Sequence, residues 1–226
     1  MKVLSVIRAE SVRALRPIAG DLGYPPTAVS RLVNQYGFLG LPKPEDLVNV
    51  DPAKGLTFSA GRFAFLGGRE VAIDYLQVFP AGLSVTTHTN TTEADFILES
   101  ILEWAHGQFG LQFEPIKPGI AHGSQLEVRL EKSLADLFPM LSAVGEAISE
   151  NLDPWWGTKL SFEPAHLNFW ADKSKYPLVP PQGFRLERRE GIPFEQMVYY
   201  SEAPMSTDKH IQVLTTLERV CLENLK

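Results

Sequence analysis

Two short polar motifs carry the side chains of this sequence that are best suited to binding a ligand or moving a proton. They read His88-Thr89-Asn90 and His166-Leu167-Asn168, and Trp170 follows the second motif. In an extended strand, residues i and i+2 share a face, so each motif would present an imidazole beside an amide. An imidazole titrates near neutral pH. These five side chains, His88, Asn90, His166, Asn168 and Trp170, are therefore a candidate ligand site. The alternative interpretation is that they are exposed polar residues at strand ends.

A basic run formed by Arg185, Arg188 and Arg189 is a candidate anion site. Guanidinium groups bind phosphate or carboxylate groups through two parallel hydrogen bonds. Glu187 and Glu190 interleave with these arginines, so ion pairing within the chain is the interpretation that we favour.

A single acidic residue, Asp74, lies within an otherwise apolar run. A buried carboxylate needs a partner, and Arg62 and Arg69 are close enough in sequence to supply one. We expect a structural ion pair rather than catalysis.

Four aromatic residues form a candidate interaction surface: Trp155, Trp156, Tyr199 and Tyr200. The two tryptophans fall in 153–157, which we predict to be a turn because it contains proline and glycine. Tryptophan is costly to expose and frequent at the hot spots of protein interfaces. The alternative interpretation is that the tryptophans anchor their loop beneath the sheet.

The sequence contains none of the motifs GxxxxGK[ST], GxGxxG, HExxH, GxSxG or CxxC. Their absence argues against P-loop hydrolysis, a Rossmann cofactor site, zincin proteolysis and an α/β-hydrolase. His122-Gly123-Ser124 does not form a base and nucleophile, because sequence neighbours point in divergent directions. Neither His-x-Asn motif has a third ligand at a spacing typical of metal sites. We therefore predict no catalytic residue, no metal and no cofactor.

Composition narrows the class of protein. The chain has 226 residues, 44% of them apolar, which suits one large domain or two closely packed halves. A net charge of -6 disfavours binding to nucleic acid or anionic membranes by bulk charge. The single cysteine, Cys221, excludes an internal disulfide and fits a reducing compartment. No apolar stretch is long enough to span a bilayer, so we expect a cytoplasmic protein.

The first half of the chain alternates between helical and extended patterns. Residues 3–37 are predicted to form two helices. The second is opened by Pro25-Pro26-Thr27 and has apolar residues at helical spacing, at Val29, Leu32, Val33 and Tyr36. Residues 56–90 predict three strands, with Gly67-Gly68 making the first hairpin turn. A helix should follow from Thr91 or Thr92, with Thr92 and Asp95 forming a capping box.

The second half repeats this pattern. Residues 115–123 predict a loop and residues 126–130 a half-exposed strand. A helix over 134–151 should bury a stripe that includes Leu141, Val144 and Ile148. Strands are expected near 159–171, 183–189 and 195–201, before a final helix over 207–224.

These elements predict an α+β fold in the order αα-βββα-βα-βββα, with helices on one side of a largely antiparallel sheet. Thr92 aligns with Thr207 and Leu102-Glu103 with Leu217-Glu218, which predicts a pseudo-repeated βββα unit. Residues 1–55 would be a helical segment packed on a body over 56–226, whose pseudo-repeated halves are 56–151 and 152–226.

Our leading functional hypothesis is a non-enzymatic binding or assembly protein of the bacterial cytosol, which binds a protein partner or self-associates. Exposed strand edges and the tryptophan turn favour it. The alternative is a metabolite-binding domain or enzyme with a site on the polar sheet face around His88 and His166. A third hypothesis, nucleic-acid binding through a twisted sheet, is disfavoured by the acidic net charge.

Overall fold

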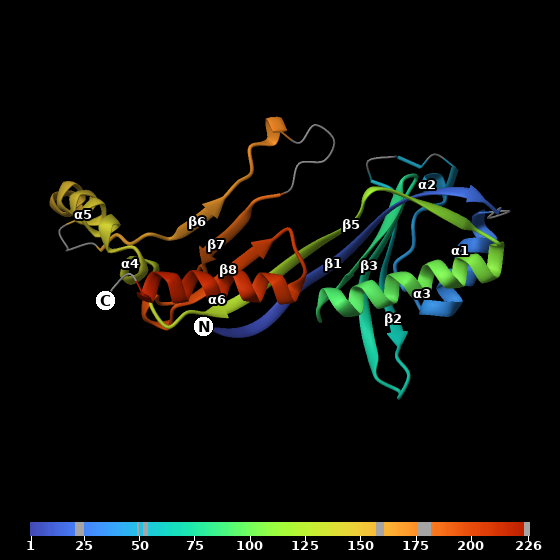
Figure 1. Cartoon of the computed structure of the whole chain (residues 1–226), viewed down its shortest axis with the longest axis horizontal. Helices are drawn as coiled ribbons and strands as arrows, with labels where there is room; N and C mark the ends of the chain where they lie inside the picture. The colour runs from blue at the N-terminus through green and yellow to red at the C-terminus, as the bar shows by residue number, and fades with distance from the viewer. Residues whose placement is uncertain (21–24, 49, 52–53, 157–160, 176–181, 224–226) are drawn as a thin grey trace. The chain divides into compact units, whose positions relative to one another are not determined.

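The computed structural model describes residues 1–226 apart from 21–24, 49, 52–53, 157–160, 176–181 and 224–226 (Figure 1). The strands are β1 (Lys2–Ala19), β2 (Leu56–Ala64), β3 (Glu70–Phe79), β4 (Gly82–Thr87), β5 (Gln112–Arg129), β6 (His166–Phe169), β7 (Phe184–Arg188) and β8 (Val198–Ala203). The α-helices are α1 (Pro25–Tyr36), α2 (Pro44–Val48), α3 (Thr91–Phe109), α4 (Leu134–Leu137), α5 (Ser142–Trp156) and α6 (Thr207–Glu223). Short 3-10 helices are η1 (Pro139–Leu141), η2 (Lys173–Lys175) and η3 (Phe194–Gln196).

The predicted α+β class with a mainly antiparallel sheet is confirmed. Strand β1 pairs antiparallel with β4, β2 with β3, β3 with β4, β6 with β7, and β7 with β8. The chain divides into two compact units. The N-terminal unit is Val6–Ser124 with Met205–Thr207, and the C-terminal unit is Met1–Ser5, Gln125–Pro204 and Asp208–Lys226.

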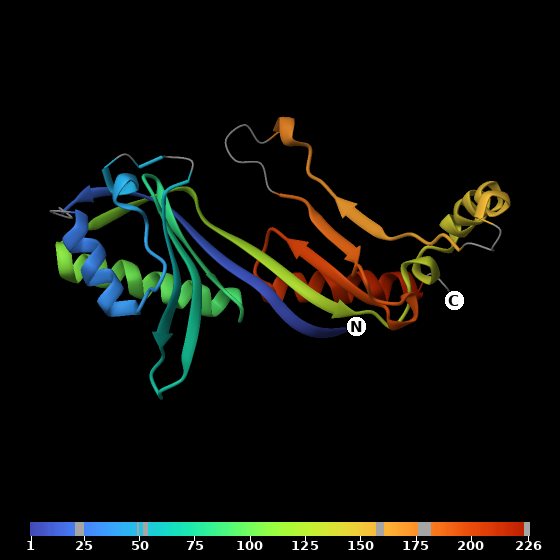
Figure 2. The same cartoon turned by 180° about the vertical axis from the view of Figure 1, so that it is seen from behind.

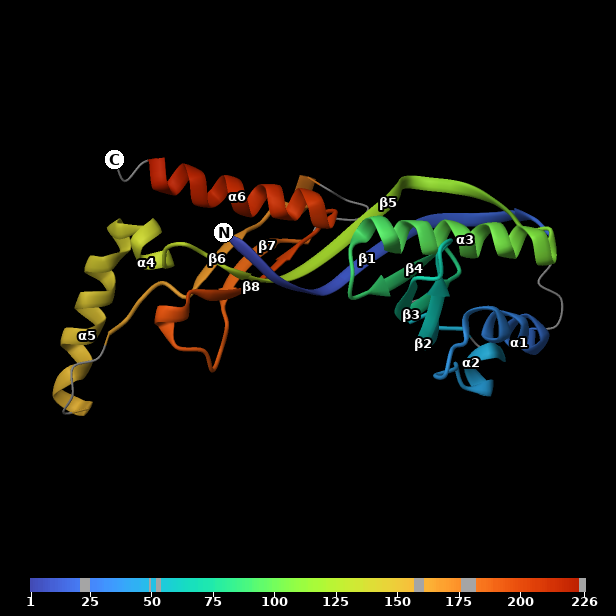
Figure 3. The same ribbon diagram turned by 90° about the horizontal axis from the view of Figure 1, so that it is seen from below.

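Each unit places a long helix against its strands. In the N-terminal unit the strand order is β2-β3-β4-β1-β5, and α3 packs against β4 (Figure 3). In the C-terminal unit the order is β5-β8-β7-β6, and α6 lies along β8 (Figure 2). The long strands β1 and β5 contribute residues to both units.

The helix predicted at the start of the chain is wrong, because Lys2–Ala19 form strand β1. Ala9, Ser11, Arg13 and Leu15 are buried at every second position, while the residues between them are partly exposed. Two of these four side chains are polar, so the period-2 pattern of apolar residues is hidden in the sequence. Pairing with β4 decides the conformation, as in the register Ala9↔Thr87. Among the described residues of the predicted helical segment over 1–55, the helices are α1 and α2.

The loop predicted over 115–123 is also wrong, since it lies within the strand β5. Pro115, Pro118 and Gly119 suggested a break, because proline donates no hydrogen bond to a ladder. Proline's fixed φ is nevertheless compatible with extended backbone. Gly119 has φ 79°, a conformation that lets a long strand change direction locally.

The predicted meander over 56–90 is confirmed as β2, β3 and β4. Gly67 and Gly68 have φ of 100° and 85°, so the hairpin turn needs the conformational freedom of glycine at both positions. A pair such as Phe58↔Leu76 fixes the register of β2 on β3 and places both apolar side chains in the core.

The helical region over 134–156 differs from its prediction in three ways. Pro139 interrupts it, giving α4, η1 and then α5. The stripe expected to be buried is exposed in part, at Leu141, Val144 and Ile148. Residues 155 and 156 are the last of α5 rather than part of a turn.

The order of elements repeats along the chain. The segment from β1 to α3 consists of a strand of 18 residues, then helices, three strands and a long helix. The segment from β5 to α6 has the same order. The repeat in element order is therefore longer than the predicted βββα unit, and its second copy starts at Gln112 rather than at residue 152.

The starts of α3 and α6, which were aligned in the sequence, contact each other through two reciprocal hydrogen bonds. Thr91 N–H donates to Thr207 Oγ1 at 3.1 Å, and Thr207 N–H donates to Thr91 Oγ1 at 2.9 Å. Both threonines are buried, so no water replaces these bonds. The equivalent residues are thus Thr91 and Thr207, one position from the predicted alignment.

The N-cap of α3 is Asn90, not Thr92 as predicted. Asn90 Oδ1 accepts from Glu93 N–H at 2.8 Å, which satisfies a first-turn amide. At the other end Gly110, with φ 64°, donates its N–H to His106 O and ends the helix.

We expect Thr91→Val to lower the free energy of unfolding by about 1–3 kcal/mol, because it leaves the buried Thr207 N–H without an acceptor. Thr92→Val, at an exposed neighbouring position, is the control and should change it by less than about 0.5 kcal/mol. Urea denaturation measures both. Equal losses from the two variants would show that the reciprocal bonds contribute nothing.

Candidate functional site

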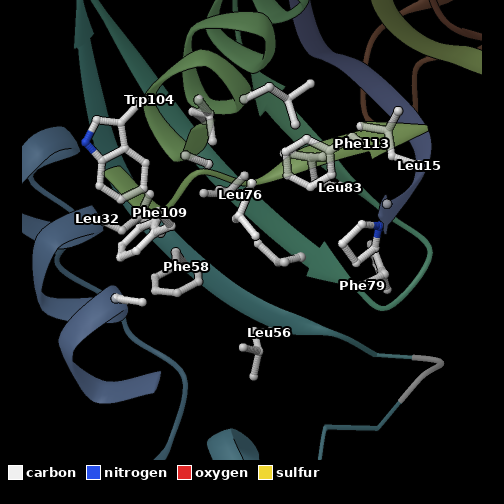
Figure 4. A pocket seen from close by; sticks show the side chains of 18 of the residues that line it. Leu15, Leu32, Leu56, Phe58, Leu76, Phe79, Leu83, Trp104, Phe109 and Phe113 are labelled. Atoms are coloured by element: carbon white, nitrogen blue, oxygen red, sulfur yellow. The ribbon is translucent and has the colours of Figure 1, made fainter. Parts of the chain in front are cut away.

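One candidate site is an apolar pocket in the N-terminal unit (Figure 4). Its floor is the sheet, through residues such as Phe58, Leu76 and Leu83 of β2, β3 and β4. Its walls come from the helices α1, α2 and α3, so these helices and the pocket lie on one face of the sheet. We call this site the apolar pocket.

The apolar pocket forms where the packing of α3 on the sheet loosens. The first part of the helix is fully packed, with Ala94, Ile97 and Leu98 at 0% exposure. Towards its end, Trp104 and Phe109 are only partly buried and line the pocket instead. The same helix thus provides both the core and the pocket wall.

The pocket has a volume of about 330 Å³, within the size range of small-molecule sites. Among the lining residues that the structure describes, none is charged, and the indole N–H of Trp104 is the single polar side-chain group. The site therefore has no groups for proton transfer or metal binding. It can exclude water and enclose hydrocarbon.

Sequence reasoning missed the apolar pocket. Its lining comes from β1, α1, α2, β2, β3, β4, α3 and β5, which span most of the unit. The apolar residues of each element suggested only that the element is buried. A weak signal was the aromatic content at the end of α3, where Trp104 and Phe109 lie close in sequence.

A polar cluster joins α3 to β1 and β5 in the same unit. Asp95 accepts hydrogen bonds from Ser11 Oγ and, at 3.0 Å, from Arg13 Nη1. His122 Nε2 lies 2.9 Å from Asp95 Oδ2, and Arg13 Nε donates to Glu99 Oε1 at 2.9 Å. This cluster brings together residues up to 111 positions apart, from Ser11 to His122, and no sequence motif predicts it.

The cluster is structural rather than a nucleophile with its base. Ser11 and His122 both bind the carboxylate of Asp95, so the imidazole does not lie between the hydroxyl and the acid as in a catalytic triad. Partial burial by itself raises the pKa of Asp95, but the hydrogen bonds from Ser11 and His122 outweigh it and hold the pKa below its usual value. Asp95 therefore stays charged and orients its donors.

The two His-x-Asn motifs fall in different units, and the partners described for each lie in its own unit. His88 contacts Asp74 Oδ2 through Nε2 at 2.7 Å and Ile7 O through Nδ1 at 2.6 Å. Asp74 thus pairs with His88 rather than with the predicted Arg62 or Arg69. Asn90 caps α3, so its carbonyl oxygen already has a structural role.

The second motif lies on the terminal strand β6. His166 and Asn168 on this strand, and Trp170 just after it, are exposed, and His166 Nδ1 lies 3.8 Å from Glu187 Oε2. His88 and Asn90 are committed to their neighbours, and the second motif is a row of exposed side chains. These placements give neither motif the enclosed geometry of a ligand site.

The four aromatic residues predicted as a surface are placed differently. Tyr199 is 0% exposed, and its hydroxyl binds Leu134 N–H and Arg188 Nη1, so it belongs to the core. Tyr200 is partly buried, and the centroid of its ring lies 5.1 Å from the guanidinium carbon of Arg185. The side chains of Trp155 and Trp156 lie outside the described residues.

The predicted arginine run is engaged within the chain. Arg185 Nη2 lies 2.8 Å from Glu202 Oε2, and Arg189 Nε lies 3.4 Å from Glu127 Oε1. Arg188 stacks on Phe194 at 4.1 Å. Its Nε and Nη2 atoms are buried and have no hydrogen-bond partner among the described residues, but solvent does not reach them in this conformation.

No group of three or more His, Cys, Asp or Glu residues is arranged to hold a metal ion within the described part of the chain. No described helix is both long and apolar enough to cross a membrane. Comparison of the chain with protein-family models, with curated proteins and with solved structures found no match.

One buried histidine in the C-terminal unit is a pH-sensitive group. His210 of α6 is 0% exposed and its Nε2 lies 2.8 Å from Ser201 Oγ. Ser201 donates its own proton to Arg185 O, so Nε2 is the donor to Ser201. Burial lowers the pKa of His210 to about 4 from 6.5, because a charged imidazole would lose its hydration.

We expect His210 to make the protein less stable as the pH falls from about 6.5 towards 4. In this window the unfolded chain takes up a proton at His210 while the folded protein does not, so the free energy of unfolding falls. His210→Gln keeps a donor for Ser201 and does not titrate, so it should flatten this dependence. Urea denaturation at several pH values measures it, with the exposed His166→Gln as control. An unchanged slope in His210→Gln would contradict the assignment.

Proposed function

We propose that the protein binds a small, largely hydrocarbon ligand in the apolar pocket. The observation that carries this proposal is a concave site of about 330 Å³ whose described lining has no charged side chain. An occupant must match that chemistry, because a polar group placed inside would lose its water and find almost no partner.

The alternative, a cavity with no occupant, is costly. A pocket filled only by water leaves its apolar walls in contact with solvent, and covering such surface contributes about 25 cal/mol per Å². The pocket is partly open, so water can enter, but water gains little from walls that offer almost no hydrogen bonds.

The expected occupant can be sized. A water molecule takes about 30 Å³ of liquid and a methylene group is similar, so the pocket suits a chain on the order of ten carbons. Each buried methylene contributes about 0.8 kcal/mol, which is about fourfold in affinity. Binding would be driven by the removal of apolar surface from water rather than by specific polar contacts.

Binding to a protein partner or to a second copy is the second candidate function, and one observation favours it. Phe63, Phe65 and Phe96 form an aromatic cluster on the N-terminal unit, with ring centroids 4.9 to 5.9 Å apart. Phe96 is 54% exposed, and Leu66 at the tip of the β2–β3 hairpin is fully exposed. Clustered exposed aromatic side chains are typical of interface hot spots. Tyr199, one of the four residues predicted to form an interaction surface, is buried, whereas this aromatic cluster is exposed in part.

We place either activity in the cytoplasm. The single free cysteine, Cys221, is buried, and the chain does not use disulfides for stability. This usage is typical of proteins from reducing compartments.

The ligand proposal predicts saturable binding of straight-chain alcohols, from 1-hexanol to 1-decanol, measured by isothermal titration calorimetry. Affinity should rise about fourfold per methylene, and the heat capacity change should be negative, because apolar surface is buried. Ala105 lines the pocket, so Ala105→Phe should fill it and lower the affinity for 1-decanol by at least about tenfold.

The matched control for this experiment is Gly107→Phe on the same helix. Gly107 is exposed and does not line the pocket, and a Cβ added there has no heavy atom within 4 Å, so binding should not change. Equal binding to both variants, or no saturable binding of any alcohol, would exclude the pocket as a ligand site.

The second candidate predicts concentration-dependent self-association in sedimentation velocity. Leu66→Asp should abolish it, because a charge at the fully exposed hairpin tip is unfavourable in an apolar interface. Leu39→Asp, at another exposed leucine, should leave it unchanged. A monomer at every concentration would rule out a second copy as the partner of this surface.

A further inference from the structure

We propose that the ligand of the apolar pocket is a single-chain amphiphile with an anionic head group, and that Arg31 binds this head group at the rim. The inference rests on the proposed function of the pocket and adds the charge and position of the ligand's polar end. The occupant is a free monomer such as a medium-chain carboxylate, not a membrane surface.

Arg31 is placed at the rim of the pocket by two contacts. It lies on α1 between Val29 and Leu32, which both line the pocket. Its guanidinium carbon is 5.7 Å from the ring centroid of Phe109, which lines the pocket from α3. Figure 4 shows Leu32 and Phe109 side by side on the wall that α1 and α3 form. Arg31 is exposed, so a head group in solvent can reach it.

The charge of Arg31 is not neutralised by the described part of the chain. Its single described hydrogen bond goes to the neutral Gln108 Oε1, at 3.4 Å, and no described carboxylate lies within 4.0 Å of its guanidinium nitrogens. Arg16 provides the contrast, since it lies between the pocket residues Leu15 and Pro17 but donates to Glu114 Oε2 at 2.8 Å through Nε. Of these two arginines beside the pocket, Arg31 is the one with an open carboxylate site.

The chemistry of the lining requires the head group to be at the rim. No charged side chain is described inside the pocket, so a carboxylate there would be desolvated without compensation. At the rim it keeps water on one side and accepts two parallel N–H bonds from the guanidinium group. The net charge of -6 gives the protein no general attraction for anions, so a preference for an anionic ligand must be local.

The test compares decanoate with 1-decanol, which share the chain length and differ in the head group. At pH 8 and low salt, decanoate should bind the wild-type protein about three- to fivefold more tightly, the range of an exposed ion pair. This ratio should fall to about one in Arg31→Gln, be partly kept in Arg31→Lys, and shrink as salt is added. Arg16→Gln is the matched control and should keep the wild-type ratio.

Each outcome separates this inference from the proposed function. If 1-decanol and decanoate bind equally, and Arg31→Gln changes neither, the pocket binds apolar chains but the head-group assignment is wrong. If neither compound binds, the pocket proposal itself fails. Cosedimentation with phosphatidylglycerol vesicles, without saturable binding of decanoate, would overturn the free amphiphile in favour of a lipid surface. Melting curves of the variants confirm that each remains folded, as expected for an exposed side chain.

Discussion

The packing of α3 against the sheet is the constraint on which the N-terminal unit depends. Ala94, Ile97, Leu98 and Ile101 are removed from solvent on one face of the helix, and the sheet supplies their partners. Burial of this face stabilises the unit without specifying a direction, because apolar contact is non-directional. The angle of the helix must therefore come from other interactions.

Directional bonds at the start of α3 supply that angle. Asp95 binds donors from β1 and β5, and Thr91 exchanges hydrogen bonds with Thr207. These bonds are concentrated in the first turns of the helix. Its far end is held by larger, looser aromatic contacts, such as Trp104 against Tyr36 at 6.1 Å. The apolar pocket opens at that less constrained end. The concentration of directional bonds at the start of α3 therefore accounts for both the angle of the helix and the location of the pocket.

Both candidate functions follow from apolar surface that the described chain leaves uncovered, but the shapes differ. The apolar pocket is concave and suits a small chain-like molecule, whereas the cluster of Phe63, Phe65 and Phe96 suits a larger partner surface. In our proposal Arg31 distinguishes among chain-like ligands by the charge of the head group. The lining of the pocket has no charged side chain and does not discriminate in this way. A ligand site at one place on the unit does not preclude a protein interface at another.

The sequence by itself determined the elements whose signals are local. Gly67-Gly68 marked the hairpin and alternation marked the meander, because each depends on the φ of single residues or on nearest neighbours. Tertiary structure decided the rest. Lys2–Ala19 form a strand because β4 pairs with them, and no pattern within the segment could show this. His122 meets Asp95 across 27 residues, and the pocket draws on eight elements. These features are sums of contacts between distant segments, and a single sequence records the residues of such a contact but not their proximity.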